Sequence, residues 1–94
     1  MNALIGDIGN TISKICVIDI KTLKIKKIVY FNTNQTSLKN IFKKKLKKYL
    51  KKGNYHQNAL FSIVVKKYKK IFKIFLSKNY LIKLKEIKDK NIKK

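Results

Sequence analysis

Three apolar stretches near the N-terminus, joined by short turns, are the feature that most limits how this chain can fold. They occupy residues 2–8, 12–20 and 24–32, and they are rich in β-branched and aromatic side chains, which favour extended strands. Gly9-Asn10 separates the first two stretches and suits the positive φ angles of a tight hairpin turn, and Lys21-Thr22 makes the second turn. Because two strands joined by a short turn lie antiparallel, the sequence predicts a three-stranded antiparallel meander.

The spacing of apolar residues changes after this meander. From Leu38 to Leu50 they recur every three or four positions, which predicts a helix over residues 37–52. Thr36 or Ser37 can cap the start of this helix. Gly53 can end it in the left-handed conformation that other residues avoid.

The rest of the chain predicts two further strands and a second helix. Residues 59–65 are almost continuously apolar, which favours a strand covered on both faces, as in a parallel sheet. Residues 68–76 predict an amphipathic helix that Asn79 can close, residues 81–87 predict a last strand, and residues 88–94 form a charged tail. The expected fold is therefore α/β, with the order β-β-β-α-β-α-β. Two short helices cannot cover both faces of such a sheet.

Lysine dominates the composition. The 94 residues include 25 lysines, no arginine and four acidic residues, which gives a net charge of +21. Lys, Ile and Asn make up 49 of the 94 residues, and codons of A and T alone specify all three. We interpret the charge mainly as codon bias, because nucleic-acid surfaces normally draw on arginine. We expect no specific nucleic-acid partner; a small Lys-rich nucleic-acid-binding protein is the alternative function.

Few residues outside the turns carry chemistry. Cys16 lies among apolar neighbours and is expected to be a small buried hydrophobe, while His56 is expected in a solvated loop. A single cysteine excludes a disulfide within the chain and fits a reducing compartment. No apolar run is long enough to span a bilayer, and the N-terminus does not resemble a secretory signal. We therefore expect a cytoplasmic protein with no membrane contact.

The turn between the first two stretches holds the one chemical motif, Asp7-Ile8-Gly9-Asn10-Thr11. An acid at a strand end can hold Mg²⁺, directly or through water, beside bound phosphates. Gly9 lets the backbone approach a phosphate, and the turn amides and the Thr11 hydroxyl can donate to its oxygens. The competing interpretation is an ordinary hairpin turn with a solvated Asp7. The residue types alone favour neither the phosphate-binding turn nor the ordinary hairpin turn.

Two segments resemble one enzyme family. Leu4-Ile5-Gly6-Asp7-Ile8-Gly9-Asn10-Thr11 is similar to the N-terminal signature of the type III pantothenate kinases, which belong to the actin-like (ASKHA) ATPase superfamily. Ser62-Ile63-Val64-Val65-Lys66 is similar to a second family motif, Ser-Ser-Val-Val-Pro, and falls on the fourth expected strand. Ile12, Ile63 and Lys66 depart from the family pattern. The resemblance implies the first ribonuclease-H-like half of the superfamily fold, with the sheet order 3-2-1-4-5.

The resemblance also implies an activity. Family members use ATP to phosphorylate pantothenate to 4'-phosphopantothenate, the first step of coenzyme A biosynthesis. The segment that aligns with their first ATP phosphate-binding loop comprises Asp7, Ile8, Gly9, Asn10, Thr11, Ile12, Ser13 and Lys14. Asp7 would act on the ATP phosphates through Mg²⁺, which it would hold through water. The family further uses a monovalent cation, potassium or ammonium, and works as a homodimer.

Most of the family's active site has no counterpart in these residues. The pantothenate-binding segment, the catalytic Asp and a second phosphate loop of Asp-x-Gly-Thr type lie further along in the family. Asp19, Glu86 and Asp89 are not placed to replace them. We therefore expect residues 1–94 to be one N-terminal half-domain, a fragment or the product of a truncated or split gene. Such a chain would hold no catalytic residue and would be inactive alone.

Overall fold

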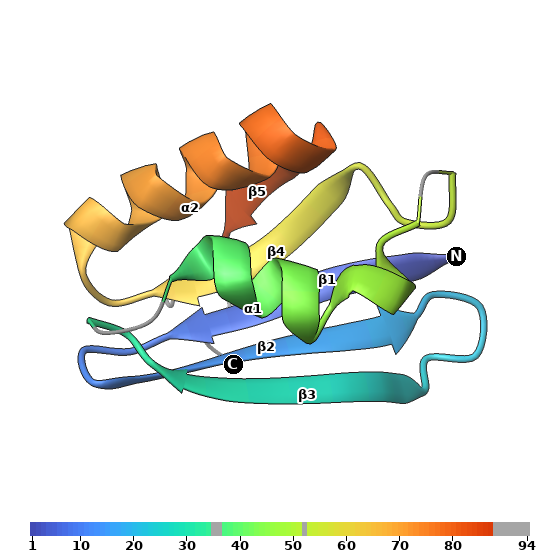
Figure 1. The fold of residues 1–94 in the computed structure, drawn as a ribbon, viewed down its shortest axis with the longest axis horizontal. Coiled ribbons are helices and arrows are strands. Elements are labelled where there is room, and N and C mark those ends of the chain that lie inside the picture. The colour runs from blue at the N-terminus through green and yellow to red at the C-terminus, as the bar shows by residue number, and fades with distance from the viewer. Residues whose placement is uncertain (35–36, 52, 88–94) are drawn as a thin grey trace.

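Five strands, two helices and one short 3-10 helix make up the computed structural model, which describes residues 1–34, 37–51 and 53–87 (Figure 1). The strands are β1 (Asn2–Ile8), β2 (Ile12–Asp19), β3 (Ile25–Asn32), β4 (Asn58–Ile63) and β5 (Lys83–Glu86). The helices are α1 (Leu38–Lys44), the 3-10 helix η1 (Lys47–Tyr49) and α2 (Lys66–Tyr80). The charged tail predicted for residues 88–94 lies outside the described residues.

The strands form one mixed sheet in the order β3-β2-β1-β4-β5. β1, β2 and β3 pair antiparallel, as the short turns require, and β4 and β5 continue the sheet in parallel with β1. This arrangement confirms the predicted order of elements and the predicted order of strands. It is consistent with a ribonuclease-H-like half of the ASKHA fold.

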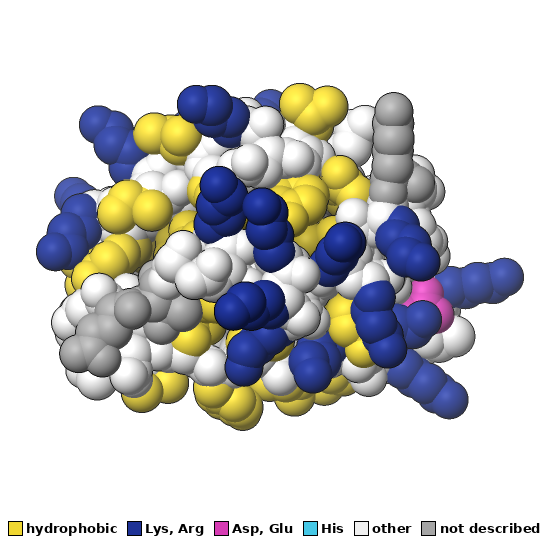
Figure 2. Space-filling model, viewed as in Figure 1, with side chains coloured by type: hydrophobic (Ala, Val, Ile, Leu, Met, Phe, Trp, Pro, Cys, Tyr) yellow, Lys and Arg dark blue, Asp and Glu magenta, His cyan; other side chains and the backbone are white. Residues whose placement is uncertain are grey.

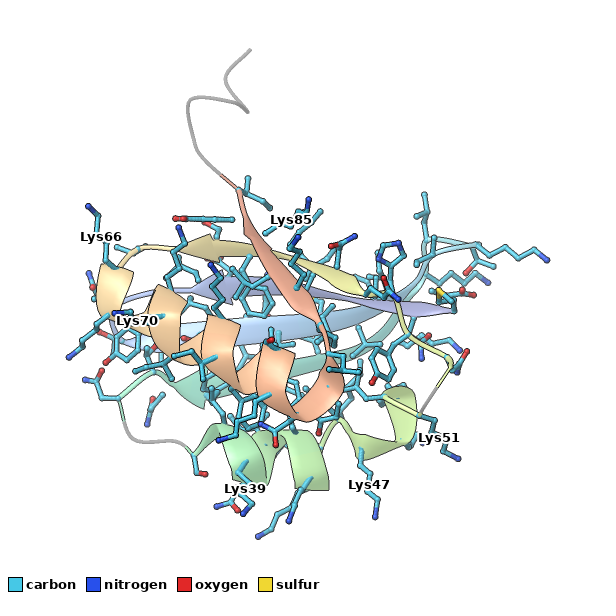
Figure 3. The ribbon with its side chains drawn as sticks, turned by 90° about the horizontal axis from the view of Figure 1, so that it is seen from above. Lys39, Lys47, Lys51, Lys66, Lys70 and Lys85 are labelled. Atoms are coloured by element: carbon cyan, nitrogen blue, oxygen red, sulfur yellow. The ribbon has the colours of Figure 1, made fainter. Side chains whose placement is uncertain are left out.

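Both helices lie on the same side of the sheet, as the view from above shows (Figure 3). The core lies between them and the inward side chains of the strands, among them Leu4 and Ile8 of β1. The prediction that the fourth strand is covered on both faces is wrong, because Leu60 on the opposite side is 47% exposed. No helix covers that side within the described residues. The expectation that two helices could not cover both faces is thus confirmed.

A glycine and a phenylalanine meet at the centre of this core. Gly6 of β1 and Phe61 of β4 are paired neighbours in the parallel ladder. A Cβ atom on Gly6 would overlap the Phe61 ring, so the strand pair needs glycine at this position. The ring itself is fully buried and packs against Phe72 of α2, with 5.6 Å between the ring centroids. This contact therefore links the two central strands to the helix above them.

The single helix predicted over residues 37–52 is wrong in its second half. α1 ends at Lys44, and the chain bends before the turn of η1. Tertiary contacts compete with the continuing helix here. The buried side chain of Asn2 donates from Nδ2 to the Tyr49 carbonyl at 2.9 Å, and Leu46 is fully buried. These contacts hold the chain after Lys44 against β1 and the core.

The predicted helix ends also differ from the observed ones. Ser37 occupies the N-cap position of α1 but forms no side-chain capping bond, and Thr36 lies outside the described residues. Gly53 has the expected left-handed conformation, with φ of 82°, although the helix has ended before it. Asn79 does not close α2. The helix runs to Tyr80 and ends at a left-handed Leu81.

Leu81 closes α2 as a left-handed (αL) cap. Its N–H donates to the Ser77 carbonyl at 3.2 Å, and the Ile82 N–H donates to the Leu76 carbonyl at 3.1 Å. The φ of Leu81 is 58°, a conformation that costs most residues other than glycine about 1–2 kcal/mol. Its side chain is 83% exposed, so little packing offsets this cost.

The turn between β2 and β3 is held by Asp19, at the end of the sheet opposite to the Asp7 turn. The Thr22 hydroxyl donates to Asp19 at 3.0 Å, and the Lys21 N–H donates at 3.2 Å. These two hydrogen bonds lower the pKa of Asp19, because they favour its charged form. The Asp19 carboxylate is therefore already satisfied within the fold.

The two strands at the edges of the sheet carry lysines. β3 has Lys26 and Lys27, and β5 has Lys83 and Lys85, all with exposed side chains. None of the described helices is long and apolar enough to cross a membrane.

Replacing Gly6 should destabilise the fold by overpacking. We expect Gly6→Ala to lower the free energy of unfolding by about 1–3 kcal/mol, since the new methyl group must displace the buried Phe61 ring. Urea denaturation followed by circular dichroism measures the loss. Phe61→Leu opens space beside residue 6, so adding Gly6→Ala to that variant should cost clearly less. An equal cost in both backgrounds would show that the ring is not the obstacle.

Replacing the left-handed Leu81 by glycine should stabilise the end of α2. We expect Leu81→Gly to raise the free energy of unfolding by about 0.5–1 kcal/mol. Glycine removes the strain of the left-handed conformation in the folded state, and the greater conformational entropy of glycine in the unfolded chain offsets part of this gain. The matched control is Ile71→Gly, an exposed position inside the same helix, which should lose about 1 kcal/mol. Thermal and urea denaturation of both variants check the opposite signs. A destabilised Leu81→Gly protein would contradict the conformation assigned to this residue.

Candidate functional site

The carboxyl ends of β1, β3, β4 and β5 meet at one edge of the sheet, on the left in Figure 1. Ligands of open α/β sheets bind outside such an edge, where loops leave the strands. Three segments lie along it: the turn after β1, Thr33 after β3 and the start of α2 after β4. The motif singled out in the sequence, Asp7 to Thr11, is therefore at the edge where a ligand would bind.

The turn after β1 differs from the tight Gly9-Asn10 turn that the residue types suggested, since residues 9–11 connect β1 and β2. The Gly9 N–H donates to the Ile12 carbonyl at 3.2 Å, which closes the hairpin. The predicted positive φ angles are wrong, because neither Gly9 nor Asn10 has one. Glycine is needed for a different reason. A Cβ on Gly9 would lie 2.8 Å from the Ile12 carbonyl oxygen, closer than atoms tolerate.

Thr33, which the sequence analysis did not identify, stabilises this turn through hydrogen bonds. Its Oγ1 donates to the Gly9 carbonyl at 3.0 Å and is hydrogen-bonded to the Ser13 hydroxyl at 2.5 Å. Its N–H donates to the Thr11 carbonyl at 2.8 Å. Thr33 lies 24 residues after Gly9 and is 7% exposed. No local pattern marks it, and only the pairing of β2 with β3 brings it under the turn.

Asp7 lies at this end of the sheet, one residue before the end of β1. Its side chain is exposed and lies on the side of the sheet away from the helices. In the two ladders of β1, Asp7 is paired with Lys14 of β2 and with Ser62 of β4. Within the described residues its carboxylate forms no ion pair, even with Lys14 beside it. The group is therefore open to a cation or to water.

The other predicted loop residues divide into two groups. Ile8 and Ser13 are fully buried, so the side chain of Ile8 is part of the core and the Ser13 hydroxyl serves the Thr33 contact. Asn10, Thr11 and Ile12 are exposed. Across the described part of the chain, the N–H groups of Asn10 and Thr11 have no partner, so both can donate to an added anion.

A hollow of about 690 Å³ lies at the ends of β4 and β5 and the start of α2. It is lined by Ser62, Ile63, Val64, Lys66, Lys69, Glu86 and Ile87. Lys69 is paired with Glu86 at 3.0 Å. Since Ser62 is the ladder partner of Asp7, the hollow and the carboxylate share one stretch of the edge. The hollow gives room for a ligand and has basic groups on its wall.

These groups suit a magnesium–phosphate ligand. No cluster of three or more His, Cys, Asp or Glu side chains that could hold a metal exists in the described ranges. Magnesium does not need one, because it keeps several of its waters and takes one or two carboxylates together with phosphate oxygens. The exposed, unpaired carboxylate of Asp7 and the open amides of the turn fit this pattern.

Lysine side chains spread over the helical face of the molecule (Figure 2). Those exposed on α1, η1 and α2 are Lys39, Lys43, Lys44, Lys47, Lys48, Lys66, Lys67, Lys70, Lys73 and Lys78. Such a surface attracts polyanions without selecting a sequence. Phe72 of α2 is part of the core and Phe75 packs against it, so neither ring is available to stack on a nucleic-acid base. His56 is exposed, as expected, whereas Cys16 is only half-buried and not the buried residue predicted.

Comparison with known proteins adds one relative. A type III pantothenate kinase of Pelagibacter ubique (strain HTCC1062) is 35% identical over 91 residues, which is 97% of this chain. The chain is homologous to type III pantothenate kinase. It spans 36% of the length of that kinase. No protein-family model matches the chain, and no solved structure matches it. The homology to the kinase agrees with the observed sheet order and with the resemblance of the Asp7–Thr11 segment.

Removing the hydroxyl of Thr33 should loosen the turn. We expect Thr33→Val to lower the free energy of unfolding by about 1–3 kcal/mol, because Ser13 Oγ and the Gly9 carbonyl lose their buried partner. Urea denaturation measures this. The control is Thr11→Val, an exposed position in the same turn, which should change stability by less than about 0.5 kcal/mol. Equal effects of the two substitutions would contradict the supporting role of Thr33.

Proposed function

We propose that this chain is the ATP phosphate-binding half-domain of a type III pantothenate kinase. In that role it would take part in the phosphorylation of pantothenate by Mg-ATP to 4'-phosphopantothenate, in coenzyme A biosynthesis. The observation that carries the proposal is the position of the Asp7–Thr11 turn. In a chain homologous to such a kinase, the turn offers an unpaired carboxylate and open amides at the ligand-binding edge of the sheet.

Each part of the edge has a role in this proposal. The N–H groups of Asn10 and Thr11 donate to phosphate oxygens of ATP, and the Thr11 hydroxyl adds a donor. Lys14, the ladder partner of Asp7, adds positive charge beside them. Asp7 would hold Mg²⁺ through water, and Mg²⁺ would supply neutralisation of the phosphate charge. Positioning and charge neutralisation account for most of the catalysis of phosphoryl transfer, so these are useful parts of a kinase site.

The remaining parts of the reaction are assigned to residues outside this chain. We propose that residues 1–94 are one N-terminal half-domain and hold no catalytic residue. The catalytic base, the pantothenate site and a second phosphate loop would lie in the portion of the kinase that the chain does not span. A homodimer, a monovalent cation and a cytoplasmic location belong to the same proposal, as the family resemblance implies. Alone, the chain would bind the nucleotide without transferring its phosphate.

A chimeric enzyme tests this proposal. Residues 1–87 would be joined to the remaining portion of the Pelagibacter ubique kinase, in place of the segment they match. We expect the chimera to phosphorylate pantothenate with Mg-ATP, measured by ADP release coupled to NADH oxidation. Asp7→Asn should lower its rate by about 10- to 100-fold, as expected when a carboxylate acts on a metal through water.

The matched control is Asp19→Asn, which removes a half-buried carboxylate at the far end of the same sheet. Asp19 is engaged with Thr22 and Lys21, so its loss should leave the rate nearly unchanged. The isolated chain should bind Mg-ATP in a calorimetric titration, and Asp7→Asn should weaken that binding. A folded chimera without activity, or one that Asp7→Asn does not slow, would overturn the proposal.

A further inference from the structure

The hydroxyl groups of Ser13 and Thr33 form a chain of hydrogen bonds that ends on the turn after β1. Thr33 Oγ1 donates its one proton to the Gly9 carbonyl at 3.0 Å, so it can only accept in its 2.5 Å contact with Ser13 Oγ. The Ser13 hydroxyl is therefore the donor in that contact. Ser13 is fully buried and Thr33 is 7% exposed, and hydrogen bonds in such a buried chain strengthen one another.

This chain of hydrogen bonds fixes the direction of one peptide group in the turn. The Gly9 carbonyl and the Asn10 N–H belong to the same peptide unit, which is planar and trans. In a trans unit the C=O and the N–H bonds point in opposite directions. Since the Gly9 carbonyl points to the buried hydroxyl of Thr33, the Asn10 N–H points away from Thr33, and the side chain of Asn10 is exposed.

The backbone of Thr33 contacts the same turn independently of its side chain. The Thr33 N–H donates to the Thr11 carbonyl at 2.8 Å, next to the pair formed by Ile12 and Asn32 in the ladder of β2 and β3. Any residue other than proline at position 33 can form this main-chain bond. Only a residue with a hydroxyl group can donate to the Gly9 carbonyl as Thr33 does. A substitution at position 33 thus separates the side-chain contact from the strand pairing.

We infer that Thr33 is a positioning residue for the ATP phosphate site, because its hydroxyl holds the Gly9 carbonyl in the orientation that presents the Asn10 N–H to a phosphate oxygen. The identity of the ligand in this inference rests on the proposed function. Thr33 acts through the turn, since its own hydroxyl is buried and already bonded to Ser13 and Gly9. An amide that is oriented before the phosphate arrives binds it more tightly, because the turn loses less conformational freedom on binding. Without the hydroxyl, the Gly9 carbonyl lacks this donor and the peptide unit is free to rotate.

Calorimetric titration of the 94-residue chain with Mg-ATP tests the inference. We expect Thr33→Val to raise the dissociation constant about 10-fold, the effect of losing one hydrogen bond to a charged group. Thr33→Ser keeps the hydroxyl and should bind Mg-ATP like the wild type. The matched control is Ile71→Gly, which lowers stability at an exposed position of α2 and should leave the dissociation constant unchanged.

A second measurement needs no nucleotide. The heteronuclear ¹H–¹⁵N NOE of each backbone amide reports its motion on the picosecond to nanosecond timescale. In the wild type and in Thr33→Ser, we expect the amides of Asn10 and Thr11 to be as rigid as those of β1. In Thr33→Val we expect these two amides to become mobile while the amides of β2 and β3 stay rigid. A residue that only stabilised the fold as a whole would not affect these two amides selectively.

Failure of the inference and failure of the proposed function give different results. A wild-type chain that does not bind Mg-ATP would contradict the proposed function, and the NOE would still decide whether Thr33 orders the turn. Equal affinity of the wild type and Thr33→Val, equal weakening in Ile71→Gly, or rigid Asn10 and Thr11 amides in Thr33→Val would each overturn the inference. Circular dichroism checks that every variant is folded. Thr33→Ala, which also lacks the hydroxyl, takes the place of Thr33→Val if that variant is unfolded.

Discussion

The rest of the structure depends on the close contact between Gly6 and the Phe61 ring. The meander and the parallel part of the sheet meet at β1 and β4, and Gly6 and Phe61 are one of the four residue pairs between these two strands. The ring fills the space that a side chain on Gly6 would take, and it reaches Phe72 of α2. The same glycine precedes Asp7, so the packing that joins the two halves of the sheet also fixes where the carboxylate leaves it.

The candidate site is built in the same way, from contacts between distant segments. The turn after β1 contributes the amides, β4 and α2 contribute the hollow, and Thr33 after β3 supports the turn with three hydrogen bonds. Of these three parts, only the turn amides come from one continuous segment of the sequence. The site is a property of the sheet edge as a whole, and the strands must all be in place before it exists.

Much of this arrangement could be predicted, and the failures have physical causes. Alternating β-branched residues and short turns defined the meander, and the change of spacing after residue 32 located the helices. The helix over residues 37–52 was extended too far because the chain after Lys44 follows tertiary contacts, the burial of Leu46 and the bond from Asn2 to the Tyr49 carbonyl, which no local pattern shows. Leu81 ends α2 in a conformation that its residue type disfavours, so no sequence rule could mark it. The role of Thr33 could not be predicted either, because it depends on the pairing of β2 with β3, just as the role of Asn2 depends on a contact with a residue remote in sequence.

The lysines on the edge strands have a consequence for how the molecule behaves in concentrated solution. In the described part of the chain no further strand lies beside the outer strands β3 and β5, and a sheet with such edges is prone to extend through them into aggregates. Lys26, Lys27, Lys83 and Lys85 keep like molecules apart there. The abundance of lysine, whatever its genetic origin, thus acts as colloidal protection. High salt or lysine acetylation would remove that protection while leaving the fold itself intact.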